Sequence, residues 1–157
     1  MSEHTRLIDK KLAHLANMQA YLAYSLQKVQ PWMPIYDWPS LSPEQHEALA
    51  AFRVRFSEYQ EQLGKAMRAV AIEEEQNTEP YTAVLLYMEK LGVIDGVMRW
   101  KELRELRNAI NHEYEENAER LSQFFLELSQ STPDLFNWHQ RLNNFCHETY
   151  GLEIQKS

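Results

Sequence analysis

Apolar residues recur every three or four positions along the first part of the chain, and this spacing constrains the fold more than any other feature. Residues three and four apart lie on one face of an α-helix, so the spacing predicts a long amphipathic helix over residues 4–29. The series comprises Ile8, Leu12, Leu15, Leu22, Leu26 and Val29. Pro31 should end the helix, because proline lacks the amide hydrogen that another turn needs.

The stretch "PWMPIYDWP" follows this helix and is stiffened by three prolines. It also holds three aromatic residues, Trp32, Tyr36 and Trp38. These rings could stack on a cofactor, but aromatic residues beside a helix end more often cover the end of a bundle. We therefore expect them to plug the bundle, and we expect no cofactor.

A second long helix is predicted to begin at "SPEQ" and to run to about residue 75. Ser42 is a suitable N-cap, Pro43 suits the first turn, and Gln45 can complete a capping box. The apolar stripe of this helix comprises Leu49, Phe52, Phe56, Tyr59, Leu63, Ala66 and Val70. Two helices of this length joined by a loop should pack as an antiparallel hairpin.

The second half of the chain predicts shorter helices. A helix over residues 79–91 would be capped by Thr78 and ended by Gly92. Asp95 would then cap the helix that carries the stretch "RELRNAINHEYEEN", residues 104–117.

Two more helices are expected before the C-terminus. One spans about Ala118 to Ser129, and "STPD" should start the last, with Thr132 as its cap. No segment alternates with the period of a strand. The prediction is a single domain, residues 1–157, with an all-α fold: an up-and-down bundle of four to five helices.

Composition narrows the class of protein further. No apolar run approaches the roughly 20 residues that cross a bilayer, and the charged N-terminus lacks the apolar segment of a signal peptide. A single cysteine, Cys146, excludes an internal disulfide and suits a reducing compartment. We therefore expect a cytoplasmic protein without membrane association.

Charge indicates at most a local site for phosphate. The chain has a formal net charge of −7, which argues against a broad nucleic-acid-binding surface. Between Arg99 and Arg107, however, four cations stand against two anions, and the run from Glu113 to Glu119 reverses the sign.

Arg107 occupies an unusual position in this segment. On a regular helix with Trp100 at 0°, Leu103, Leu106 and Ile110 lie at roughly 240–300° and form the apolar face. Arg107, Asn111 and Tyr114 lie at about 340°, 20° and 320°, and so form a polar row on the edge of that face. His112 falls at about 120°, away from Arg107.

Two interpretations of Arg107 stay open on spacing alone. A structural arginine would pair with a buried carboxylate or cap a helix end. A functional arginine would line a polar cleft or face a second subunit. Arginine and histidine together suit RNA cleavage, since histidine can move a proton and arginine can stabilise charge on phosphorus. A two-fold dimer would supply two histidines, one as acid and one as base.

The sequence "RNAINHEY" matches the pattern R-x4-H-x-Y with a polar residue directly after the arginine. It resembles the HEPN superfamily, and most closely the HepT-type toxins of type VII-like HEPN/MNT toxin–antitoxin modules. The similarity extends over "RWKELRELRNAINHEY", and the predicted helical bundle, the chain length and the place of the motif agree with it.

The resemblance implies a HEPN-like fold and a metal-independent endoribonuclease whose catalytic pair is Arg107 and His112. Asn108 would orient this pair, with Asn111 and Arg104 in support. The active form would be a homodimer with the motifs lining a shared cleft. RNA would be the substrate.

The resemblance also implies a means of control. A partner nucleotidyltransferase antitoxin would transfer AMP to Tyr114 and so block the site. The alternative is a non-catalytic HEPN subunit that serves a nucleotidyltransferase as partner or substrate-binding module.

Metal chemistry finds little support in the sequence. "HEYEE" is not the zinc motif H-E-x-x-H, and no phosphate-binding glycine-rich loop is present. His139, Cys146 and His147 lie at helical spacings but lack the paired arrangement of a standard zinc site. We therefore expect no metal.

Overall fold

The computed structural model describes residues 2–113 and 117–155, and every regular element in these ranges is helical. The long helices are α1 (Glu3–Val29), α2 (Pro43–Glu73), α4 (Val97–Glu113) and α5 (Ala118–Tyr150), and α3 (Tyr81–Lys90) is shorter. Two single 3-10 turns, η1 (Gln30–Trp32) and η2 (Trp38–Ser40), lie between α1 and α2. The prediction of an all-α helical bundle is confirmed.

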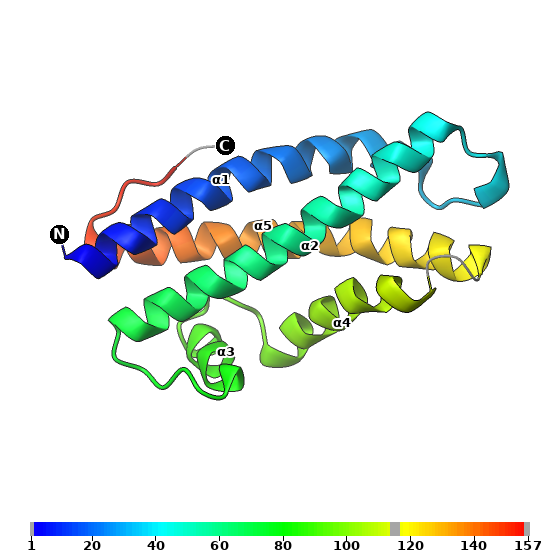
Figure 1. Cartoon of the computed structure of the whole chain (residues 1–157). Helices are drawn as coiled ribbons and strands as arrows, with labels where there is room; N and C mark the ends of the chain where they lie inside the picture. The colour runs from blue at the N-terminus through cyan, green and yellow to red at the C-terminus, as the bar shows by residue number, and fades with distance from the viewer. Residues whose placement is uncertain (1, 114–116, 156–157) are drawn as a thin grey trace.

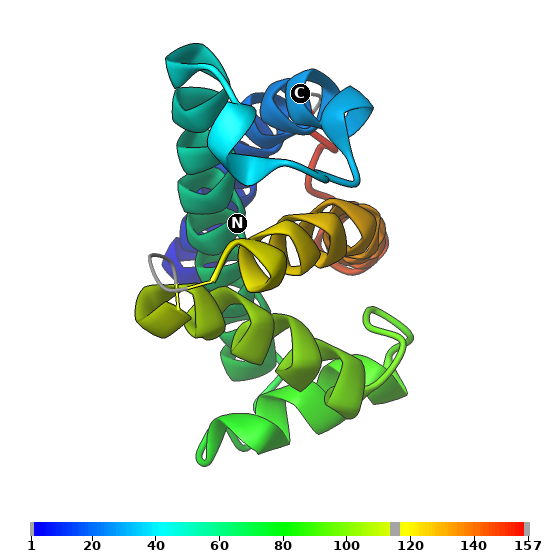
Figure 2. The ribbon, with the colours of Figure 1, turned by 90° about the vertical axis from the view of Figure 1, so that its right-hand side faces the viewer.

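The predicted hairpin of two long helices is present as α1 and α2, which lie side by side in Figures 1 and 2. The Ser2 hydroxyl caps α1 by accepting a hydrogen bond from the Thr5 amide. Ser42 and Gln45 form the predicted capping box at the start of α2. Both side chains satisfy amide groups that a helix start leaves without partners.

The other helices pack on one side of this hairpin. The long helix α5 contacts both α1 and α2, and α4 packs against α5 and α2. The short helix α3 lies at the outer edge, in contact with α2 and α4 (Figure 2). As a result, α2 is the common neighbour of every other long helix.

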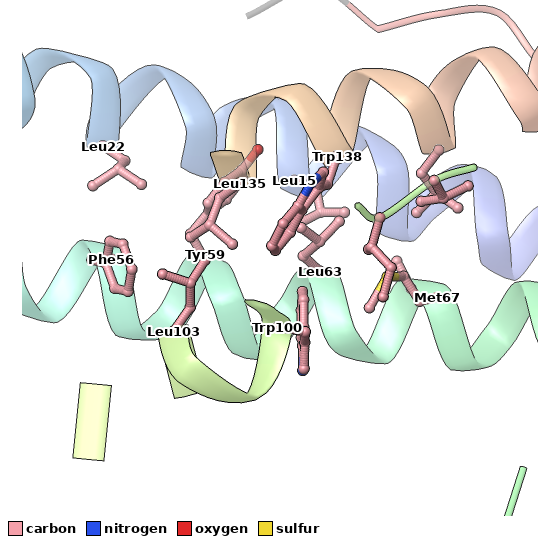
Figure 3. Packing of buried hydrophobic residues seen from close by; sticks show 14 of the residues in the cluster. Leu15, Leu22, Phe56, Tyr59, Leu63, Met67, Trp100, Leu103, Leu135 and Trp138 are labelled. Atoms are coloured by element: carbon pink, nitrogen blue, oxygen red, sulfur yellow. The ribbon is translucent and has the colours of Figure 1, made fainter. Parts of the chain in front are cut away.

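One hydrophobic core joins these helices, and α2 supplies its centre. Figure 3 shows how side chains of α1, α2, α4 and α5 meet there. The labelled residues are Leu15, Leu22, Phe56, Tyr59, Leu63, Met67, Trp100, Leu103, Leu135 and Trp138. Trp100 and Trp138 pack with their ring centroids 5.9 Å apart and so connect α4 to α5.

The prediction of two separate helices at the C-terminus was wrong. A single helix, α5, runs through Pro133. Thr132 does not cap a helix, since it is buried and its hydroxyl donates to the Leu128 carbonyl at 2.8 Å. Packing of Leu128 and Leu135 against the core on either side holds the helix together at its proline.

Two of the predicted caps were also wrong. The residue before α3 is Pro80 rather than Thr78, and no side chain caps this helix. Asp95 lies two residues before α4, and its carboxylate instead accepts hydrogen bonds from Trp138 at 3.0 Å and Arg141 at 2.7 Å. Gly92, with φ of 76°, ends the α3 region as expected.

The aromatic loop between α1 and α2 covers the bundle with two of its three rings. Trp38 stacks on Phe125 of α5 with ring centroids 5.6 Å apart, and Trp32 packs against the core. Tyr36, at 93% exposure, points into solvent. Within the described residues, no helix combines the length and hydropathy that a bilayer crossing requires.

Candidate functional site: a basic groove along α2 and α4

A pocket of about 300 Å³ opens where α2, α3 and α4 meet. Its lining residues are Gln60, Glu61, Gly64, Lys65, Arg68, Tyr81, Trp100, Arg104 and Arg107. Four of these side chains are basic and one is acidic, although the whole chain carries a net charge of −7. A concentration of positive charge on an acidic protein favours a small anionic ligand at this place.

A second pocket of about 300 Å³ adjoins the first along the same two helices. It is lined by Arg53, Val54, Ser57, Glu58, Glu61, Arg107 and Asn108. Arg107 and Glu61 line both pockets, so the two are neighbours, and we call them together the basic groove. The groove gives a chain-like ligand more than one point of contact on either side of Arg107.

Arg107 lies half-buried at the middle of this groove. Its Nη1 donates a hydrogen bond of 3.3 Å to the Ser57 carbonyl of α2. Ser57 is in the interior of α2, so Arg107 does not cap a helix end, and among the described residues no carboxylate forms an ion pair with it. The remaining guanidinium hydrogens can therefore bind a ligand in the groove.

Two other basic side chains of the groove, those of Lys65 and Arg68, are held only weakly. Lys65 pairs with Glu61 and Arg68 with Glu79, each at 3.6 Å, and all four side chains are about half exposed or more. Exposed pairs of this kind contribute about 0–1 kcal/mol, so an anion can replace them at little cost. Arg104 is exposed one turn of α4 before Arg107.

Gly64 allows the floor of the pocket to form. A β-carbon at this position would lie 3.0 Å from the Tyr81 hydroxyl and 3.2 Å from Trp100. Without it, the Tyr81 hydroxyl donates a 2.7 Å hydrogen bond to the Gly64 carbonyl, and Trp100 packs directly on α2. Burial raises the pKa of Tyr81, and nearby Arg104 and Arg68 only partly offset this effect, so the phenol stays neutral.

The structure places the residues of the R-x4-H-x-Y motif as follows. Arg107 and Asn108 line the groove, and Asn111 and His112 belong to the last turn of α4. The described part of α4 runs to Glu113, directly after His112. The side chains of residues 110–113, and Tyr114 as a whole, lie outside the described part of the structure.

The sequence predictions missed the part of the groove that α2 and α3 contribute. Lys65 and Arg68 lie on the exposed side of α2, where basic residues carry no signal. Gln60, in contrast, can be recognised from the sequence. It follows Phe56 by four residues and so places a polar amide on the apolar stripe of α2.

The two histidines near the C-terminus and the cysteine have structural surroundings. His139 is buried, and its Nδ1 lies 2.6 Å from the Tyr59 hydroxyl, while His147 Nδ1 lies 2.8 Å from the Leu152 carbonyl. Burial and nearby Glu74 raise the pKa of Cys146 to about 12, so it is no activated nucleophile. No cluster of three metal-binding side chains occurs in the described ranges.

Comparisons with protein-family models, with curated proteins and with solved structures find no match to this chain. The function must therefore be inferred from the chemistry of the basic groove and from the motif within it.

Proposed function

We propose that the protein is a metal-independent endoribonuclease that cuts RNA in the basic groove, and that it acts as the toxin of a type VII-like HEPN/MNT toxin–antitoxin pair. One observation carries the proposal. Arg107, the first residue of R-x4-H-x-Y, lies half-buried among three further cations, on the edge of the apolar face of α4.

The proposed chemistry divides the work between two side chains. Arg107 binds the scissile phosphate and stabilises the extra negative charge that forms on it. His112 accepts the proton of the adjacent 2′-hydroxyl, whose oxygen then attacks phosphorus. The bond to the 5′-oxygen breaks, and that oxygen takes a proton from an acid. The products are a 2′,3′-cyclic phosphate and a 5′-hydroxyl end.

A second copy of the chain supplies the acid in this scheme. One His112 acts as the base while the partner's His112, in its protonated form, donates to the leaving oxygen. This arrangement needs the ends of two α4 helices to meet at a two-fold axis. Asn108 and Asn111 would orient the pair, and Arg104 would hold a neighbouring phosphate.

The first test is cleavage of structured RNA in EDTA. Wild type should cut, and His112→Ala and Arg107→Ala should lose about 100-fold or more of the rate, the usual size of one acid–base or charge-stabilising group. A substrate with 2′-deoxy sugars should stay intact, because it lacks the attacking hydroxyl. Wild type that is inactive, or variants that cut as fast as wild type, would reject the catalytic pair.

The alternative is a non-catalytic subunit of a nucleotidyltransferase. It predicts a stable complex with a small nucleotidyltransferase and no cleavage by the purified protein under any of these conditions. The EDTA assay therefore distinguishes the two functions with one preparation.

The control by AMP transfer has its own test. Co-expression with a cognate nucleotidyltransferase should raise the intact mass of wild type by one or more AMP groups and leave Tyr114→Phe unchanged. The modified protein should no longer cut RNA. An unchanged mass of wild type would remove this part of the proposal while leaving cleavage untouched.

A further inference from the structure

The amide of Gln60 is the least expected feature of the basic groove. Gln60 is 1% exposed and lines the pocket together with Trp100, Arg104 and Arg107. Neither its Nε2 nor its Oε1 has a hydrogen-bond partner among the residues that the structure describes. The wall of the pocket therefore holds one donor and one acceptor without a partner, and neighbouring atoms cover both. A ligand in the pocket can pair with them once a neighbouring side chain moves aside.

This arrangement carries a cost in stability. A buried polar group without a partner destabilises a protein by about 1–3 kcal/mol per group. Leucine would fill nearly the same space and continue the apolar stripe of α2 without that cost. A ligand that pairs with the amide would explain why this position holds glutamine, since proteins depart from optimal packing mainly at functional sites.

The surroundings of Gln60 define the chemistry of such a ligand. Lys65, Arg68, Arg104 and Arg107 favour an anion at the mouth of the pocket. Tyr81 and Trp100 supply aromatic surface in its wall. A volume of about 300 Å³ is at the lower end of the range for small-molecule sites. The pocket thus suits a compact molecule with a flat polar edge at one end and a phosphate at the other.

We infer that Gln60 reads the base of one nucleotide of a single-stranded RNA, whose phosphate lies on Arg104 and Arg107. A carboxamide pairs with the adjacent donor and acceptor on the edge of a nucleobase, as glutamine and asparagine do with adenine. Single-stranded RNA offers such bases free of their partners. The identification of the ligand as RNA rests on the proposed function, whereas the pairing of Gln60 with a base does not.

Gln60 is in this account a specificity-determining residue rather than a catalytic one. It selects which nucleotide enters the pocket beside Arg107, and so selects where the chain is cut. Phosphate is common to every nucleotide, so the base contact is what distinguishes one nucleotide from another.

The test measures binding of four 5′-mononucleotides (AMP, GMP, CMP and UMP) and of ribose 5-phosphate by calorimetry. The wild type should bind at least one nucleotide about tenfold or more tighter than ribose 5-phosphate, within the range of a bidentate base contact. Gln60→Leu should bind that nucleotide no better than ribose 5-phosphate, whose affinity should not change. Gln62→Leu, on the same helix but outside the groove, should behave as wild type.

A second variant keeps the test sharp if leucine alters the pocket. Gln60→Glu replaces the donor with an acceptor, which favours guanine and its two adjacent donors. The ratio of GMP to AMP affinity should rise about fivefold or more, and this ratio cancels any repulsion of the phosphate. Thermal unfolding of each variant confirms that it is folded.

Three results would overturn the inference. Wild type could bind ribose 5-phosphate as tightly as every nucleotide, Gln60→Leu could retain the preference, or the GMP to AMP ratio could stay constant in Gln60→Glu. None of these measurements requires cleavage. A protein that pairs bases through Gln60 but cuts no RNA would reject the proposed function alone, and cleavage without base selection would reject this inference alone.

Discussion

Arg107 shows how much the position of a single residue on a helix can reveal. Its place on the edge of an apolar face marked it as exceptional, and the fold puts it in a groove with one hydrogen bond to the Ser57 carbonyl. A helical wheel gives the direction of a side chain but does not show which group the side chain contacts. Arg107 contacts Ser57 of α2, which lies fifty residues earlier in the chain.

His139 gives a prediction at the same scale. Burial lowers its pKa from 6.5 to about 4, because the charged ring cannot be hydrated between α2 and α5. The unfolded chain therefore binds this proton more readily than the folded one between pH 6.5 and 4. The histidine contributes its full stability above pH 6.5, and the free energy of unfolding should fall by about 2 kcal/mol on going to pH 5.

Denaturant titrations at pH 7 and pH 5 check this expectation. His139→Gln cannot titrate but can still accept a hydrogen bond from Tyr59, so its loss of stability between the two pH values should be smaller by about the same 2 kcal/mol. His14→Gln, on the exposed side of α1, is the matched control and should follow wild type. An equal pH dependence in His139→Gln would show that other groups cause the acid sensitivity.

At the scale of helices, apolar spacing predicted α1 and α2 closely and the later elements less well. The long apolar stripes of α1 and α2 each fit a single continuous helix. The capping box of Ser42 and Gln45 marks the start of α2. Pro133 and Thr132 gave an equally strong local signal for a helix start, yet α5 continues through them. Tertiary packing on both sides of Pro133 keeps α5 continuous, and this packing cannot be read from the local sequence.

The close approach of α2 to α3 and α4 gives a prediction at this scale. Gly64→Ala should lower the free energy of unfolding by about 1–2 kcal/mol, because the new β-carbon meets Tyr81 at 3.0 Å and Trp100 at 3.2 Å. Alanine in an exposed helix would instead raise it by about 1 kcal/mol. Urea unfolding measures the sign of the change in the free energy of unfolding. A stabilised Gly64→Ala variant would mean that the helices at the groove separate easily.

At the scale of the whole molecule, charge is distributed so that a net charge of −7 coexists with a basic groove. Composition alone predicted only that a phosphate site must be local. Two cations of the groove, Arg104 and Arg107, lie in the one segment of α4 in which the sequence shows a local excess of positive charge. The sequence could not place Lys65 and Arg68 beside them, since that depends on how α2 crosses α4.

This distribution predicts how binding responds to salt. The probe is a single-stranded oligonucleotide with 2′-deoxy sugars, which the protein cannot cut. The logarithm of its affinity should fall linearly with the logarithm of the salt concentration, with a slope of about 0.7 per phosphate contact. Arg104→Ala should lower that slope by about 0.7. Arg6→Ala, exposed on α1 away from the groove, should leave it unchanged, and equal slopes in all three proteins would place the RNA elsewhere.

If the protein is the ribonuclease that we propose, Arg107 acts on RNA in the groove and does not merely hold α4 to α2. Single-turnover cleavage in EDTA tests it most directly when Arg107→Ala, Arg107→Lys and Arg6→Ala are compared with wild type at matched unfolding free energies. We expect the cleavage rate to fall about 100-fold or more in Arg107→Ala, to recover partly in Arg107→Lys, and to stay unchanged in Arg6→Ala. Cleavage by Arg107→Ala at the wild-type rate, in a protein that is still folded, would contradict it.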